Sequence, residues 1–156
     1  MKNVIFILIM LFLTAGFLTA QTAAELETIL KTTAVSCAQA VKFVAASVNS
    51  ADSAGTVTEK DAFNTAVNEG WLSKKAEAEK PITLAELSFL IMKAFDLKGG
   101  MMYAILPGPR YAYRSMISRS FIRGDADPAM TVSGDRFLLI LGNVLNAEGS
   151  VQGGGQ

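Results

Sequence analysis

Apolar residues recur along most of the chain at the spacing of an amphipathic helix. This spacing predicts helices over residues 23–32, 37–48, 59–69, 84–95, 110–121 and 134–145. Small polar residues and Gly-Pro pairs separate these stretches and indicate loops. The short apolar run at residues 101–106 covers too little chain for its periodicity to assign a structure. The pattern therefore predicts an all-α fold in one domain.

Polar residues suited to capping a helix stand at the expected helix starts. Four residues are predicted N-caps: Ser36, Thr58, Thr83 and Ser133. Gln39 and Glu86 each follow a predicted cap at the spacing of a capping box. In that arrangement the two side chains satisfy backbone N–H groups that the first helical turn leaves free. These positions predict where the helices begin.

The start of the chain has the order of a signal peptide. Lys2 precedes an unbroken apolar run over residues 4–13, and small residues then lead to Ala20. A retained membrane anchor is the alternative, although the run is shorter than the roughly 18 apolar residues of a spanning helix. We expect residues 1–20 to be a signal peptide cleaved after Ala20, and the rest of the chain to be exported to the periplasm or cell envelope.

An internal repeat relates two parts of the chain. Residues 61–97 align with residues 111–147 at a constant offset of 50. In both stretches a helix is followed by an inward aromatic residue, a loop, a cap and a second helix. Residues 36–48 match residues 83–95 at an offset of 47, which suggests a third, degenerate unit. The alternative is that unrelated amphipathic helix pairs align loosely.

The segment that opens one of these helices is similar to a known motif. Residues 81–87, Pro-Ile-Thr-Leu-Ala-Glu-Leu, resemble the ITRAE segment of S-layer homology motifs. The apolar turns at residues 70–72 and 121–124 resemble the turn between the two helices of that family. Residues 99–114 also resemble a segment of small exported spirochaete proteins of unassigned role. The S-layer homology resemblance implies a pseudo-threefold helical bundle attached non-covalently to envelope polysaccharide.

The chain departs from the family at the position of its glycan-contacting arginine, which follows the motif's threonine. Leu84, Gly134 and Cys37 occupy this position in the three units. None of these residues can form the forked hydrogen bonds of a guanidinium group. The departure argues against the family's acidic, pyruvylated wall polymer as the ligand, and it is consistent with a retained fold whose binding chemistry has changed.

The repeat and the resemblance together predict the organisation of the chain. We expect two or three S-layer-homology-like helix–loop–helix units packed as one pseudo-symmetric bundle. The expected units and boundaries are a domain over residues 21–147, units at about residues 22–50, 57–97 and 111–147, and a flexible tail over residues 148–156. The tail is predicted because its glycine-rich end has little apolar surface to bury.

Composition removes most kinds of catalytic site. The chain has no His and a single Cys, so it lacks His-based triads, His-ligated metals, multi-Cys metal sites and an internal disulfide. Its 14 basic and 14 acidic residues cancel, which leaves no charge for nucleic acid. Asp125 and Asp127 indicate a turn, because Pro128 interrupts a calcium-loop pattern. We therefore expect no enzyme activity, no cofactor and no bound metal.

The most unusual segment covers residues 98–114, which contain all three Tyr residues of the chain. Tyr rings and Arg guanidinium groups together suit a sugar or protein surface. The expected ligand- or partner-binding residues are Tyr103, Arg110, Tyr111, Arg114 and Arg123. The alternative is a structural linker that buries Tyr113 and Met101, beside arginines that form an ordinary solvated helix face.

Two functions are consistent with these features. The leading one is a non-catalytic envelope module that binds peptidoglycan or another envelope glycan. The alternative is a periplasmic subunit or adaptor that docks on a protein through residues 98–114. Glycan binding predicts exposed Tyr and Arg around a polar groove, whereas protein docking predicts a contiguous exposed apolar patch.

Overall fold

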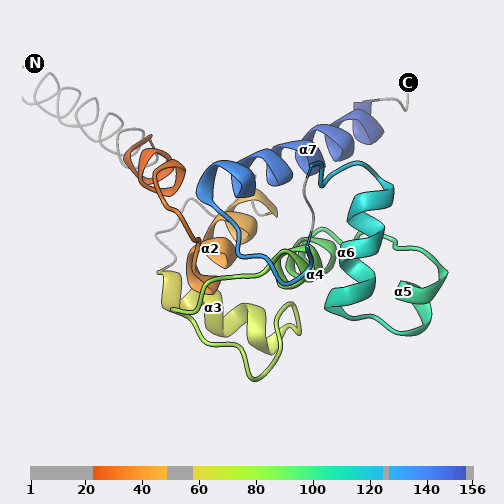
Figure 1. The fold of residues 1–156 in the computed structure, drawn as a ribbon, viewed down its shortest axis with the longest axis horizontal. Helices are drawn as coiled ribbons and strands as arrows, with labels where there is room; N and C mark the ends of the chain where they lie inside the picture. The colour runs from red at the N-terminus through yellow and green to blue at the C-terminus, as the bar shows by residue number, and fades with distance from the viewer. Residues whose placement is uncertain (1–22, 49–57, 125–126, 154–156) are drawn as a thin grey trace, which may run out of the picture.

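Helices supply all of the regular structure in the part of the chain that the computed structural model describes, which is residues 23–48, 58–124 and 127–153 (Figure 1). The helices are residues 23–30, α2 (Cys37–Val48), α3 (Glu59–Asn68), α4 (Leu84–Ala94), α5 (Met101–Ile105), α6 (Pro109–Ser118) and α7 (Gly134–Gly153). Extended pairing among these residues is limited to isolated bridges between Ser36 and Pro81 and between Thr83 and Thr131. The all-α prediction is confirmed.

The capping residues lie where the sequence predicts them. The Ser36 N–H donates to Gln39 Oε1 at 3.1 Å, and the Gln39 N–H donates to Ser36 Oγ at 3.2 Å. Thr83 and Glu86 form the second box, with distances of 3.0 Å and 3.3 Å. Thr58 Oγ1 accepts the Asp61 N–H at 3.2 Å at the start of α3. Both predicted capping boxes and the Thr58 cap are confirmed.

Two helices end three or more residues away from the prediction. Helix α6 stops at Ser118, before the predicted end, because Ser120 takes a left-handed conformation with φ 60°. Helix α7 runs to Gly153, past the predicted end at Leu145, so residues 148–153 are helical where a tail was expected. The predicted signal peptide and residues 154–156 lie outside the described residues.

Two parts of the chain repeat one local geometry at an offset of 50. Helix α3 spans residues 59–68 and helix α6 spans residues 109–118, while α4 and α7 begin at residues 84 and 134. The turn after α3 has the Trp71 N–H on the Ala66 carbonyl at 2.8 Å; after α6, the Phe121 N–H contacts the Met116 carbonyl at 3.0 Å. These donors and acceptors are each related by the same offset. Gly70, with φ 71°, therefore takes the place of Ser120.

Three buried segments are joined by a closed ring of backbone hydrogen bonds. The Val35 N–H donates to the Val132 carbonyl at 2.8 Å, and the Val132 N–H donates to the Ile82 carbonyl at 3.2 Å. The Ile82 N–H then donates to the Val35 carbonyl at 2.8 Å. All three residues are fully buried, so the ring satisfies backbone groups that have no access to water. The ring relates the segments leading into α2, α4 and α7 by a pseudo-threefold pattern.

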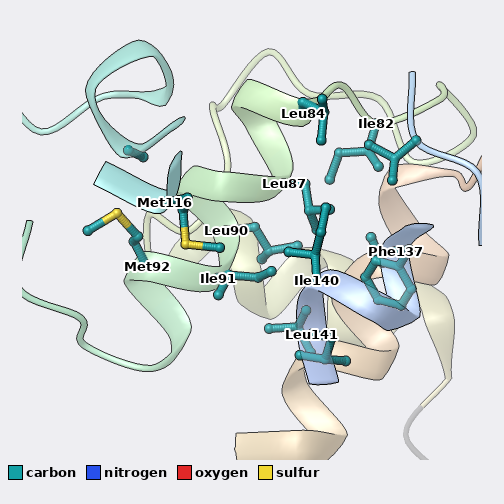
Figure 2. Close-up of a cluster of buried hydrophobic side chains, with 14 of the residues drawn as sticks. Ile82, Leu84, Leu87, Leu90, Ile91, Met92, Met116, Phe137, Ile140 and Leu141 are labelled. Atoms are coloured by element: carbon teal, nitrogen blue, oxygen red, sulfur yellow. The ribbon is translucent and has the colours of Figure 1, made fainter. Parts of the chain in front are cut away.

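The core forms around α4, which packs against both α2 and α6. Figure 2 shows Leu87 and Ile91 of α4 facing Ile140 of α7, with Met116 of α6 on the other side. These side chains are at most 2 % exposed. The edge of one aromatic ring meets the face of another between Phe43 and Phe137, with centroids 6.1 Å apart, which joins α2 to α7. The core therefore draws on all three segments that the hydrogen-bond ring connects.

Candidate docking surface

Helix α5 presents an exposed apolar surface at the margin of the bundle (Figure 1). Three side chains of α5 and that of the residue that follows it form this surface, with exposed fractions of 80 % for Met101, 49 % for Met102, 67 % for Ile105 and 60 % for Leu106. We call these four residues the α5 patch. Single exposed apolar residues are common on proteins, but a cluster held on one short helix marks an interaction surface.

Tyr103 holds the opposite face of α5 against the bundle. Its ring meets the ring of Phe89 edge-on, with centroids 6.5 Å apart, and only 8 % of the residue is exposed. A Cβ on Gly99 would lie 2.6 Å from Tyr103 Cβ, so the chain passes Tyr103 at a distance that only glycine allows. Burial raises the pKa of the Tyr103 hydroxyl, and the nearby Asp96 carboxylate adds to the rise. Tyr103 was predicted to bind a ligand or partner, whereas the structure places its ring in the core.

Polar contacts attach the residues that precede α5 to α6 and to its C-cap. The Gly100 N–H donates to Ser115 Oγ at 3.2 Å, and the Ser115 hydroxyl donates to the Tyr111 carbonyl at 3.0 Å. The Arg119 guanidinium donates to the Lys98 carbonyl. Since Ser115 is only 6 % exposed, the Gly100 contact is shielded from competing water. The α5 patch is therefore held outward by a fixed support.

The predicted basic residues do not all gather at one place. Arg110 and Arg114 are exposed and lie one helical turn apart at the start of α6. Tyr111 between them is half-buried against the core, so it offers part of its ring at most. Arg123 follows the other end of α6, where its Nε donates to the Ser120 carbonyl at 3.2 Å. Arg110, Tyr111 and Arg114 therefore lie together in the first half of α6, whereas Arg123 lies beyond the C-terminal end of this helix.

The segment around α5 is uniformly basic. Residues 97–124 contain five cationic side chains and no carboxylate: Lys98, Arg110, Arg114, Arg119 and Arg123. The two ion pairs found within the described residues, Lys31–Glu27 and Lys42–Glu25, involve other cations. The positive charge of this segment is therefore only partly offset along the chain, because the nearest carboxylates, Asp96 and Asp125, lie just outside it.

The positions that the predicted S-layer homology resemblance assigns to a glycan-contacting arginine are buried. Leu84 and Cys37 are at most 2 % exposed, and a side chain on the buried Gly134 would overlap the Ile29 carbonyl. The first N–H groups of their helices are also occupied: the Cys37 N–H donates to the Lys80 carbonyl at 2.9 Å, and the Leu84 N–H to the Met130 carbonyl at 2.9 Å. These helix starts are therefore not open to an anionic group.

The thiol of Cys37 has no environment that would activate it. Burial raises its pKa to about 11, with Glu86 adding to the rise and Lys80 opposing it. The neutral thiol therefore predominates at ordinary pH, and it packs in the core as an apolar side chain. This agrees with a structural position for the cysteine.

A shallow hollow lies at the other end of the bundle, between residues 23–30, α2 and the start of α3. Its volume is about 180 Å³, and the Glu25–Lys42 ion pair, at 2.9 Å, lies in its wall. The rest of the lining consists of Ala24, Thr28, Ile29, Gln39, Phe43 and Glu59. With the cation and one carboxylate already paired, the hollow brings together no set of groups for acid–base or nucleophilic chemistry.

The described residues contain no cluster of three or more His, Cys, Asp or Glu side chains suited to a metal ion. No helix within residues 23–48, 58–124 and 127–153 is long and apolar enough to cross a bilayer. The α5 patch is therefore the feature of the described surface that most needs an explanation.

Comparison with known proteins does not assign this surface. No protein-family model, curated protein or solved structure matches the chain. The resemblance to S-layer homology motifs consequently stays a prediction based on residues 81–87 and the repeat.

Residues 98–114 were singled out from the sequence, with a different side of α5 expected to be exposed. Tyr103 was expected at the surface and Met101 was a core residue in the linker interpretation, whereas the structure reverses the two. A usable signal was present, because the Gly pair at residues 99–100 and the Pro-Gly-Pro at residues 107–109 limit the helix to little more than one turn. Such a short helix can bury one face only, and the large aromatic ring occupies it.

Proposed function

We propose that this chain is an exported, non-catalytic docking module that attaches to a component of the cell envelope through the α5 patch. The observation that carries the proposal is an apolar surface that is held outward by a buried anchor, Tyr103. A side chain that faced water by accident would need no such support. Docking through residues 98–114 agrees with this arrangement better than binding in a polar groove does.

The tyrosines favour docking over glycan binding. A sugar site of the predicted kind needs exposed Tyr rings beside Arg side chains. Tyr103 and Tyr113 are buried, and Tyr111 is half-buried. Arg110 and Arg114 are free to contact a partner, but the surface beside them is aliphatic and thioether-rich rather than aromatic. The group best placed for contact is therefore apolar.

The expected energies support an attachment that needs both apolar and charged contacts. Complete burial of a Leu, Ile or Met side chain contributes about 1.5–3 kcal/mol. The four side chains of the α5 patch are already partly buried, so covering their exposed area would contribute roughly 4–8 kcal/mol in total. Association itself costs at least roughly 4 kcal/mol. The patch alone would therefore give weak binding, and Arg110 and Arg114 would supply additional attraction.

The proposal is tested by binding residues 21–156 to isolated cell envelopes, which contain membranes and peptidoglycan. All described helices lie within residues 23–153, so this chain contains the whole described bundle. We expect the double variant Ile105→Ser/Leu106→Ser to bind at least about tenfold more weakly, because it removes apolar area from the contact. The measurement is the bound fraction after sedimentation over a range of protein concentrations.

A matched control separates the α5 patch from general surface hydrophobicity. Leu139 on α7 is 61 % exposed, as much as the two substituted residues. Leu139→Ser should leave envelope binding unchanged, and thermal unfolding should show that both variants are folded. Equal binding of the double variant and the unsubstituted chain would contradict docking through α5.

A further inference from the structure

The chemistry around the α5 patch is more specific than docking in general. We propose that its partner is the surface of an anionic lipid bilayer, with the apolar side chains inserted among the lipids and the neighbouring cations on the phosphate groups. This inference rests on the proposed docking function and names the partner for the same site. Four observations carry it: the shape of the surface, its side-chain types, its charge and its support.

The α5 patch stands at the outer edge of the molecule, away from the hollow near α2 (Figure 1). Helix α5 packs on α6 at the margin of the bundle, and the hollow near α2 lies at the other end (Figure 1). Met101 and Ile105, the most exposed residues of the patch, lie one helical turn apart. The side chains of a projecting apolar edge leave water only if the partner surrounds them with apolar groups. A bilayer provides this medium without a matching pocket.

The side chains of the patch suit lipid better than a protein hot spot. Protein hot spots are enriched in Trp, Tyr and Arg that fill shaped pockets. The aromatic residue of α5, Tyr103, is turned into the core, and the patch contains only Met, Ile and Leu. Flexible aliphatic and thioether side chains gain from transfer into hydrocarbon without any requirement for shape.

The charge of the segment selects an anionic surface. Exposed cations flank the patch on both sides in sequence, with Lys98 before it and Arg110 and Arg114 after it. Residues 97–124 carry five cations and no carboxylate, so the segment remains attracted to acidic headgroups although the exposed Asp96 stands just before it. Arginine also binds phosphate through two parallel hydrogen bonds, which a lysine cannot form.

The support of α5 makes insertion possible without refolding. The Gly100–Ser115 hydrogen bond and the buried Tyr103 ring fix the helix before any partner is present. The side chains of the patch are therefore already displayed, and little conformational entropy is lost on binding.

Vesicle sedimentation tests the inference directly. Residues 21–156 are mixed with vesicles of phosphatidylglycerol and phosphatidylcholine, and separately with vesicles of phosphatidylcholine alone. We expect binding to the mixed vesicles that is at least about tenfold stronger than binding to phosphatidylcholine alone, and that weakens at high salt. Ile105→Ser/Leu106→Ser and Arg110→Gln/Arg114→Gln should each reduce this binding, whereas Leu139→Ser should not.

Envelope binding separates failure of the lipid inference from failure of the docking proposal. Protease treatment of envelopes before mixing should leave binding intact if lipid is the partner. If binding to envelopes depends on Ile105 and Leu106 but is lost after protease treatment, and vesicles do not bind, the partner is a protein and the lipid inference is overturned. If envelopes bind the double variant as well as the unsubstituted chain, the docking proposal itself fails.

Discussion

The direction in which α5 faces depends on one ring and one missing methyl group. Tyr103 is the residue of α5 that enters the core, and its ring lies where a side chain on Gly99 would have to be. Because the ring is fixed, Met101 and Ile105 on the other side of the helix are fixed in the solvent. The exposure of the α5 patch is therefore a consequence of core packing.

Replacing Gly99 with Ala should disturb this arrangement. The added Cβ would lie 2.6 Å from Tyr103 Cβ, so either the ring or the backbone must move. We expect a loss of about 1–3 kcal/mol in the free energy of unfolding, as for other overpacked sites. Denaturant unfolding measures this loss, and the Tyr103 environment is followed by its fluorescence or NMR signals.

Gly142→Ala provides the matched control. An added Cβ at Gly142 in α7 would meet nothing within 4 Å, so the better helix propensity of Ala should stabilise the chain by up to about 1 kcal/mol. Equal effects of the two substitutions would show that Tyr103 does not restrict residue 99.

At the scale of single elements, α4 begins with a complete capping box and packs at the centre of the bundle, against both α2 and α6. Thr83 Oγ1 both accepts the Glu86 N–H and donates to Glu86 Oε2 at 2.7 Å, while Glu86 reaches back to the Thr83 N–H. The next two N–H groups, of Leu84 and Ala85, donate to carbonyls at residues 130 and 128. The cap therefore also sets the contact between two units of the bundle.

Removing this cap should cost more than an ordinary surface substitution. We expect Thr83→Ala to reduce the free energy of unfolding by about 1–2 kcal/mol, near the upper end for N-caps, because Glu86 also loses the Thr83 hydroxyl and keeps only the backbone N–H of residue 83. Thr83→Ser keeps the hydroxyl and should retain most of the stability. Equilibrium urea unfolding compares the two, and a similar loss in both variants would indicate that the Thr83 methyl group, not the cap, is responsible.

The elements were predictable where local chemistry decides them. The capping boxes at Ser36 and Thr83 could be read from residue spacing, because each involves residues within one helical turn. For α5, the flanking Gly and Pro residues indicate a short helix with one buried face. Which side chain that face carries depends also on Phe89, which lies in another helix and meets Tyr103 only after folding.

At the scale of the whole molecule, the hydrogen-bond ring of Val35, Ile82 and Val132 joins segments from three parts of the chain. Each of these residues donates one bond and accepts another, so loss of any segment leaves two unsatisfied buried groups. An unpaired buried backbone group costs about 1–3 kcal/mol. The ring should therefore behave as one cooperative unit.

Amide hydrogen exchange tests this cooperativity. The amides of Val35, Ile82 and Val132 should exchange at one common free energy, equal to that of global unfolding, because none can open alone. The Ala104 amide in α5, which donates to the Gly100 carbonyl at 3.1 Å at an exposed position, should exchange sooner through local opening. Early exchange of one ring amide would contradict the cooperative description.

The same ring sets the order in which the protein can form. Val35 stands near the start of the described chain and Val132 near its end, yet the two must pair before either is satisfied. A chain that is still being synthesised can form α2 and α4, but the ring stays open until residue 132 has emerged. Contacts between residues so far apart in sequence form slowly. The growing polypeptide therefore stays incompletely folded, with buried backbone groups of the ring unpaired, until residue 132 is available.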